Sequence, residues 1–205
     1  PHPREPDRKP LPLATTHRYN TSAMIHDPRL VIGIQQPSLK TQSETIMVQI
    51  QRLFEEAGWN PTDLNALVLT DGPGSYTGLR ISMTVAKVLG LVQGIQLYTL
   101  SSLQLLCGTQ DDVYAVMDAR AKRVYTGQYR KGIAVHEDTT LTIEDALTKI
   151  PADAVVVGDA SLLHHPERPS DCLKHFIDLK DQWKPVDNIH TLSPRYLKDT
   201  DNYGL

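Results

Sequence analysis

The sequence predicts an α/β protein with a mixed β-sheet covered by helices. Three short strand-like segments at 11–16, 21–26 and 30–36 are separated by turn-forming residues, which indicates an antiparallel meander. An amphipathic segment and a glycine-rich strand-to-helix corner follow, and this order indicates parallel strands joined by helical crossovers. A meander followed by helix-linked strands gives a mixed sheet with helices on its faces.

Two helices are predicted in the first half of the chain. The segment 41–57 carries Met47, Ile50 and Phe54 at steps of three and four, which is typical of an amphipathic helix. The segment 78–93 is apolar around nearly its whole circumference. Such a helix is either buried on all sides or paired with a partner, and a large exposed apolar patch usually marks an interaction site. We therefore expect a partner on one side of this second helix.

A strand at 95–100 and a short helix from Ser101 complete the order βββαβαβα, which is the ribonuclease H-like arrangement. After about Thr109 the pattern restarts with the strand DVYAVMD, its hairpin partner RVYTGQYR and a third short segment. A weak helix at 143–150 and an apolar strand at 154–159 follow. The second half is therefore predicted to be a reduced version of the first.

This restart predicts the domain organisation. We expect an N-terminal ribonuclease H-like lobe at 10–108 and a smaller C-terminal lobe at 109–205. The proline-rich opening at 1–9 is expected to be a disordered leader or an expression remnant. The tail from 174 onward is expected to be partly irregular, with PRYLK at 194–198 packing back on the body.

Composition excludes several classes of function. The net charge of -3 gives no long-range attraction to nucleic acid, so any RNA contact must be local or made by a partner. Cys107 and Cys172 lie far apart and form neither a CxxC motif nor a disulfide framework, which suits a reducing compartment. No apolar run approaches the roughly 20 residues that span a bilayer. We therefore expect a cytoplasmic protein without a membrane contact.

The corner DGPGSYTGLR at 71–80 is the first candidate for chemistry. Glycines between a strand and a helix let the backbone approach a ligand, so Gly72, Gly74 and Ser75 could hold a phosphate. The spacing, however, matches no nucleotide fingerprint, and no phosphate-binding lysine follows. The favoured alternative is a tight turn in which Ser75 or Thr77 caps the helix.

The candidate metal ligands and the candidate nucleophile lack the spacing that metal sites and catalytic serines require. Asp71, Asp118 and Asp159 end predicted strands, where carboxylates either hold magnesium or serve as turn and cap residues. The eight histidines show no HxxxH or HExxH spacing. Ser75 does not lie in a GxSxG nucleophile elbow. The sequence therefore predicts neither a metal site nor a catalytic nucleophile.

The predicted hairpin concentrates positive charge beside aromatic residues. On a hairpin some of these side chains share a face and could contact an RNA backbone, whereas the alternative is an ordinary solvated face. The residues are Arg120, Lys122, Arg123, Arg130 and Lys131, with Tyr125 and Tyr129.

The segment GPGSYTGLRISMTVAKVLG closely resembles the hallmark of the TsaB family, also called YeaZ. The resemblance extends to SSLQLL, MDARAKRVYTGQY and PRYLK, and it spans about 11–198. It implies an actin-like, Hsp70-like ATPase fold of two ribonuclease H-like lobes, the second reduced. It also implies a protein that is not an enzyme and holds no cofactor.

The resemblance also implies partners. Family members are scaffolds that dimerise with their paralogue TsaD, which transfers threonylcarbamoyl to the adenosine beside the anticodon in tRNAs that read ANN codons, forming t6A. The ATPase TsaE joins the complex, and free TsaB forms a homodimer through much the same surface. Contact with tRNA is then made mainly through the complex.

Carried over residue by residue, the partner surface lies on the two helices of the first lobe. It comprises Met47, Ile50 and Phe54 on the first helix, and Arg80, Met83, Thr84, Lys87 and Val88 on the second.

Two departures from the family pattern weaken any claim of nucleotide or metal binding. Where members carry a strand that ends in Asp-Thr-Ser, this chain has Thr15, Thr16 and His17, without the carboxylate of an actin-like site. Thr41 and Gln42 stand where members often carry Asn-His. An actin-like ATPase or phosphotransferase at the glycine corner stays open as an alternative, and a glycoprotease-like hydrolase would need a metal or nucleophile that the sequence does not offer.

Overall fold

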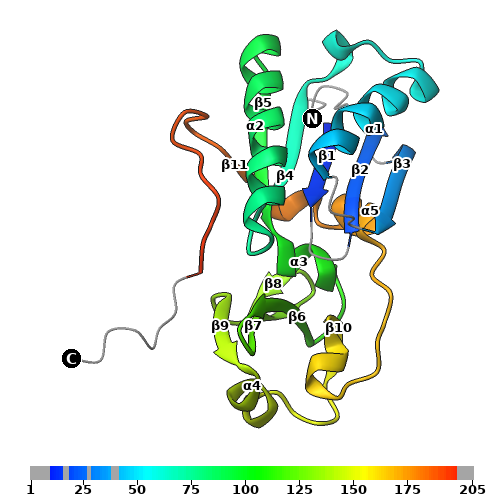
Figure 1. Ribbon diagram of the computed structural model, residues 1–205. Coiled ribbons are helices and arrows are strands. Elements are labelled where there is room, and N and C mark those ends of the chain that lie inside the picture. The colour runs from blue at the N-terminus through cyan, green and yellow to red at the C-terminus, as the bar shows by residue number, and fades with distance from the viewer. Residues whose placement is uncertain (1–9, 16–18, 27–28, 38–41, 198–205) are drawn as a thin grey trace, which may run out of the picture.

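The computed structural model of this chain describes residues 10–15, 19–26, 29–37 and 42–197 (Figure 1). The predicted leader, the departures at Thr16, His17 and Thr41, and Lys198 at the end of the PRYLK segment lie outside these residues.

The described strands form two sheets, and the first has six strands in the order β11-β5-β4-β1-β2-β3. Strands β1, β2 and β3 form the predicted antiparallel meander, and β4 pairs in parallel with both β1 and β5. The last strand, β11, pairs antiparallel with β5. The bounds are β1 Pro10–Thr15, β2 Tyr19–His26, β3 Arg29–Pro37, β4 Ala66–Gly72, β5 Gln96–Ser101 and β11 Lys184–Pro185.

Two long helices cover one face of this sheet: α1 (Gln42–Ala57) lies against β2 and β3, and α2 (Tyr76–Gln93) lies against β1, β4 and β5 (Figure 1). Both predicted helices are confirmed, although α2 begins two residues before the predicted start. A short 3₁₀ turn, η1 (Pro61–Asp63), follows α1. The core beneath the helices includes Ile46, Ile50, Leu53, Leu67, Leu69, Met83, Ala86 and Leu97.

The second sheet has the order β10-β6-β7-β8, with β9 paired to β7. The predicted hairpin of β6 and β7, the helix α4 and the strand β10 are confirmed, whereas β9 was not predicted. The bounds are β6 Val113–Arg120, β7 Arg123–Arg130, β8 Ile133–Ala134, β9 Thr139–Thr142, α4 Ile143–Lys149, β10 Val155–Gly158 and the 3₁₀ helix η2 Ala160–Leu163.

One apolar cluster joins the two sheets. Helix α3 (Ser102–Cys107) contacts strands of both sheets, and the cluster around it combines Val68 and Leu100 of the first sheet with Ala115 and Val157 of the second. Because Val68 alternates with its neighbours in β4, it points away from the face that α1 and α2 cover. The two halves therefore share a continuous core.

The C-terminal region is partly irregular, as expected. Residues 186–197 contain no helix or strand, whereas helix α5 (Cys172–Asp178) and the turn η3 (Lys180–Gln182) are regular. The physical reason is that Phe176 is fully buried in the shared core, and this burial stabilises a helix of only two turns. Both α5 and β11 pack on the first sheet although they follow residue 109, and the division at 108 stays a prediction.

The described part of the chain contains no helix that combines the length and the apolar character of a membrane span.

Candidate partner interface and glycine corner

The glycine corner is closed by the C-terminal segment of the same chain. Gly72 has a φ of +126°, and a Cβ atom there would lie 2.6 Å from the backbone oxygen of Arg195. The close backbone approach that glycine permits is therefore used by the tail. Ser75 accepts a hydrogen bond from the backbone N–H of Gly78 at 3.3 Å, which confirms the predicted helix cap.

Arg195 holds the tail against the corner. Its backbone N–H donates to the carbonyl oxygen of Asp71 at 2.7 Å. Its guanidinium donates to the carbonyl oxygen of Gly72 and to the carboxylate of Asp138, each at 2.9 Å. Its Nε lies 3.6 Å from a carboxylate oxygen of Asp71. These contacts confirm the prediction that the PRYLK segment packs back on the body.

Asp138 is the centre of a buried polar cluster between the two sheets, and its side chain is 1% exposed. Besides the guanidinium, it accepts hydrogen bonds from the hydroxyl groups of Ser101, at 2.5 Å, and Tyr129, at 2.6 Å. Gly127 in β7 leaves room for this carboxylate, because a Cβ atom there would clash with it. Sequence reasoning missed Asp138, since no local pattern marks a carboxylate whose partners are distant in sequence.

Burial shifts the pKa values of two groups in this cluster. Desolvation raises the pKa of Asp71 to about 6, and the nearby Arg195 opposes this shift. Burial, followed by the charge of Asp138, raises the pKa of Tyr129 far above its ordinary value. The cluster thus holds Arg195 between two carboxylates at the junction of the sheets.

The three carboxylates that could have held magnesium do not form one site. Asp71 faces Arg195, whereas Asp159 accepts a hydrogen bond from the backbone N–H of Asp118 at 2.8 Å. Asp118 in turn accepts from the backbone N–H of Arg120 at 2.8 Å. These contacts are those of turn residues, and no group of three potential metal ligands occurs in the described part of the chain.

The basic hairpin is a largely solvated face. Arg130 lies 3.4 Å from a carboxylate oxygen of Asp112, and Lys131 lies 3.9 Å from one of Asp111. Tyr129 is buried and points away from solvent. The hairpin therefore presents fewer open cations and aromatic rings than the sequence implied.

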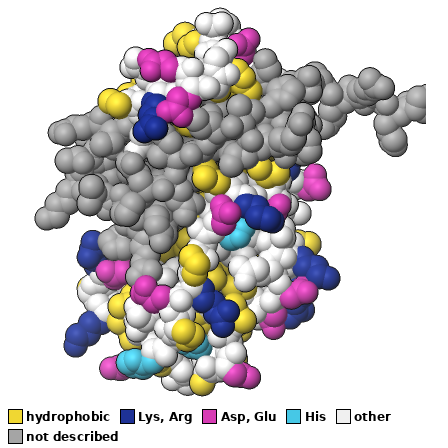
Figure 2. Space-filling view, turned by 90° about the vertical axis from the view of Figure 1, so that its right-hand side faces the viewer, with side chains coloured by type: hydrophobic (Ala, Val, Ile, Leu, Met, Phe, Trp, Pro, Cys, Tyr) yellow, Lys and Arg dark blue, Asp and Glu magenta, His cyan; other side chains and the backbone are white. Residues whose placement is uncertain are grey.

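An apolar surface lies on the outer sides of α1 and α2. Five aliphatic side chains there are more than half exposed, and a groove of about 610 Å³ lies between α1, the segment after it and Leu89 of α2. Figure 2, viewed from the side of α1 and β3 and not from that of α2, shows exposed hydrophobic side chains in the upper part of the molecule, beside acidic and basic ones. We call the five side chains the apolar surface; they are Met47, Val48, Val88, Leu91 and Val92.

The structure divides the eight predicted partner residues into six that reach the surface and two that are almost fully buried. Met47 and Val88 belong to the apolar surface, and Phe54 lines the groove. Arg80 and Thr84 are exposed on α2, and Lys87 donates from Nζ to the backbone oxygen of His190 at 3.3 Å.

Ile50 and Met83 offer little exposed surface. Each is 3% exposed and packs in the core under the helices, although Ile50 also lines the groove, so their contact with a partner stays a prediction. The predicted set also left out Val48, Leu91 and Val92, although the apolar circumference of α2 was the signal for the last two.

The chain is similar in sequence to known proteins of tRNA modification. The family model for TsaD, tRNA N6-adenosine threonylcarbamoyltransferase, matches residues 36–158. The tRNA threonylcarbamoyladenosine biosynthesis protein TsaB of Bacillus subtilis is 33% identical over 186 residues, covering 78% of this chain and 80% of the relative. TsaB of Escherichia coli is 27% identical over 133 residues, covering 58% of each chain.

The solved structure of YeaZ from Pseudomonas aeruginosa superimposes with a TM-score of 0.73 at 19% sequence identity, covering 93% of this chain and all of YeaZ. The mixed α/β fold is therefore that of YeaZ. Fold and sequence together define a protein of the class related to t6A biosynthesis in tRNA. The chain belongs to the TsaB family, and the match to the TsaD model fits the relationship between these paralogues.

Proposed function

We propose that this chain is a non-catalytic scaffold that binds a TsaD-like paralogue through the apolar surface of α1 and α2. In this proposal the pair belongs to the complex that forms t6A in tRNAs that read ANN codons. The observation that carries the proposal is the exposed apolar surface on two adjacent helices, because an exposed patch of aliphatic side chains costs free energy unless a partner covers it.

The chemistry of α2 supports a protein partner. The helix contains no Asp or Glu between Tyr76 and Gln93, and its charged residues are Arg80 and Lys87. The centre of a protein interface is depleted in charge and rich in apolar side chains, and a specific interface buries about 800 Å² per partner.

The structure of the glycine corner favours a scaffold function over an ATPase function. Gly72 makes room for the backbone of Arg195, and Ser75 caps α2, so both residues have structural partners within the chain. An actin-like ATPase or phosphotransferase would need a phosphate at this corner, and the tail occupies the approach. A calorimetric titration of the chain with ATP, ADP and GTP is expected to show no heat of binding, and binding in the micromolar range would favour the ATPase.

Two further expectations belong to the proposal. A TsaE-like ATPase joins the complex in the cytoplasm, and the free chain forms a homodimer through the apolar surface. Because the homodimer and the pair with TsaD would use the same surface, adding the TsaD-like partner is expected to dissociate the homodimer. Light scattering with increasing partner concentration measures this exchange.

The direct test is the affinity of the chain for its cognate TsaD-like protein. Val88→Glu places a charge in the middle of the apolar surface and is expected to weaken binding by at least about 30-fold. Leu147→Glu is the matched control. Leu147 is an exposed aliphatic residue on α4, and this helix packs on the second sheet, away from the apolar surface. Equal affinities of Val88→Glu and the unmodified chain would contradict the proposal.

A further inference from the structure

A pair of stacked tyrosines lies at the surface where the tail meets α2. The rings of Tyr76 and Tyr196 stack with centroids 5.5 Å apart and an interplanar angle of 23°. The side chains are nevertheless exposed, at 59% and 50%. Arg80 donates to the hydroxyl oxygen of Tyr76 at 2.7 Å, and its guanidinium carbon lies 5.2 Å from the centroid of that ring.

The polar cluster around Asp138 fixes the position of this stack. Tyr196 directly follows Arg195, which binds Asp71, Gly72 and Asp138. Tyr76 is the first residue of α2, and the capping residue Ser75 precedes it. Both rings therefore stand on anchored backbone, so a ligand that stacks on them does not have to order a loose chain.

Within the described residues, the stack has one open end. Arg80 and Tyr196 contact Tyr76, whereas half of Tyr196 stays exposed, so the outer face of Tyr196 ends the stack. A hollow of about 380 Å³ extends from Tyr76 along α2 and is lined by Thr77, Arg80, Ile81, Thr84 and Val85 as well.

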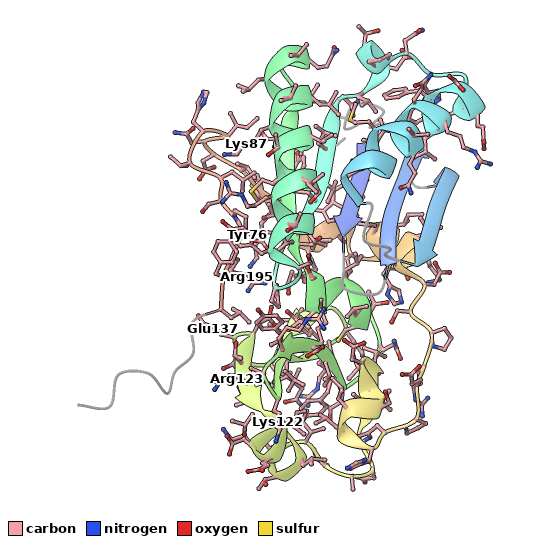
Figure 3. All side chains as sticks on the ribbon, viewed as in Figure 1. Tyr76, Lys87, Lys122, Arg123, Glu137 and Arg195 are labelled. Carbon is pink, nitrogen blue, oxygen red and sulfur yellow. The ribbon has the colours of Figure 1, made fainter. Side chains whose placement is uncertain are left out.

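Lys122, at the turn between β6 and β7, lies below Tyr76 and Arg195 in Figure 3. Arg195 is paired with two carboxylates, whereas Lys122 is exposed and available to a polyanion. From top to bottom, the view shows Lys87, Tyr76, Arg195, Glu137, Arg123 and Lys122 (Figure 3).

We propose that the outer face of Tyr196 stacks on an unpaired base of the tRNA, with Lys122 near the RNA backbone. This inference rests on the proposed function, which brings a tRNA to the complex. Unpaired bases in RNA are recognised by stacking on aromatic side chains, while cations follow the phosphates. An exposed aromatic stack together with the exposed Lys122 fits RNA better than it fits an apolar peptide, which would leave the lysine without a counter-charge.

The test uses the full chain, alone and in complex with its TsaD-like partner. The probe is a fluorescent anticodon stem-loop RNA from a tRNA that reads an ANN codon, and the readout is the dissociation constant. Tyr196→Ala is expected to weaken binding by about 5- to 100-fold, whereas Tyr196→Phe, which keeps the ring, stays within about twofold. The control Ile133→Ala changes an exposed apolar residue on the second sheet and leaves the affinity unchanged.

Salt dependence separates stacking from charge. Lys122→Ala is expected to reduce the slope of log K against log salt concentration by about one, and Tyr196→Ala leaves this slope unchanged. RNA affinity of Tyr196→Ala equal to that of the unmodified chain would overturn the inference. Loss of partner affinity in Tyr196→Ala would also overturn it, because the ring would then belong to the protein interface.

The two proposals fail separately. Failure of the unmodified chain to bind the TsaD-like protein contradicts the proposed function, while the titration of the chain alone still tests the stacking. Normal partner binding together with unchanged RNA affinity in Tyr196→Ala contradicts only the stacking.

Discussion

At the scale of residues, the structure explains the glycine corner without a ligand. Gly72 admits the backbone of Arg195, Ser75 caps α2, and Asp71 faces the guanidinium of Arg195. Each residue type that suggests a phosphate or metal site thus has a structural partner within the chain. The cost of this arrangement is a carboxylate held in a poorly solvated position, as its pKa of about 6 indicates.

This pKa predicts a pH dependence of stability. The folded state raises the pKa of Asp71 from 3.8 to about 6, so it binds the proton more tightly than the unfolded state. The resulting stabilisation is present below about pH 4 and is lost as the pH rises through 6. Asp71→Asn stays neutral, so its free energy of unfolding relative to the unmodified chain should rise by up to about 3 kcal/mol between pH 4 and pH 7. Urea denaturation at several pH values measures this difference, and a difference that does not change with pH would contradict the assignment.

At the scale of elements, α2 combines two tasks. Its inner side packs on the sheet through Leu79, Met83 and Ala86, and its outer side exposes Val88, with Leu91 and Val92 near its end. The sequence pattern predicted both helices and the need for a partner, because apolar residues on all sides exceed what one sheet can cover. It could not say how deeply each residue is buried, and Ile50 and Met83, which the prediction placed on the partner surface, are each 3% exposed.

The elements that sequence reasoning missed depend on distant contacts. Helix α5 is short and flanked in the sequence by mostly polar residues, and only the burial of Phe176 in the shared core reveals its role. Strand β9 has four residues and exists through its pairing with β7. Asp138 likewise has partners 37 and 57 residues away in the chain. Local periodicity carries no information about such contacts.

Replacing the capping residue of α2 tests whether Ser75 only stabilises the fold or also takes part in the reaction. Ser75→Ala removes the acceptor for the backbone N–H of Gly78 and is expected to cost about 1 kcal/mol of stability. Its affinity for the TsaD-like partner and the rate of t6A formation should stay unchanged below the unfolding temperature. Thermal unfolding and a reconstituted modification reaction measure the two quantities. Loss of t6A formation by a fully folded variant would show that Ser75 takes part in chemistry.

At the scale of the whole molecule, Arg195 ties the two sheets together. Asp71 belongs to β4 of the first sheet, and Asp138 directly precedes β9 of the second. One guanidinium contacts both carboxylates, while the shared apolar core supplies the rest of the junction. The tail is therefore part of the fold, and its position also sets the position of Tyr196.

Removal of this tie is expected to destabilise the chain. Arg195→Met leaves the buried Asp138 without its cation and should cost about 2 kcal/mol, less than for a fully buried pair because solvent reaches the guanidinium. Asp138→Asn in the same chain should recover part of this loss, because the amide carries no charge. Urea denaturation of the two single variants and the double variant measures the coupling. Additive effects of the two substitutions would show that the pair contributes nothing to the junction.

The central claim is that the chain acts by binding its partner and contributes no group to the reaction. The most direct measurement is the rate of t6A formation at a fixed concentration of the TsaD-like protein and increasing concentrations of this chain. Val88→Glu is expected to require a higher concentration, by the same factor as its loss of affinity, and to reach the same maximal rate. A lower maximal rate for a variant that saturates the partner would contradict the claim.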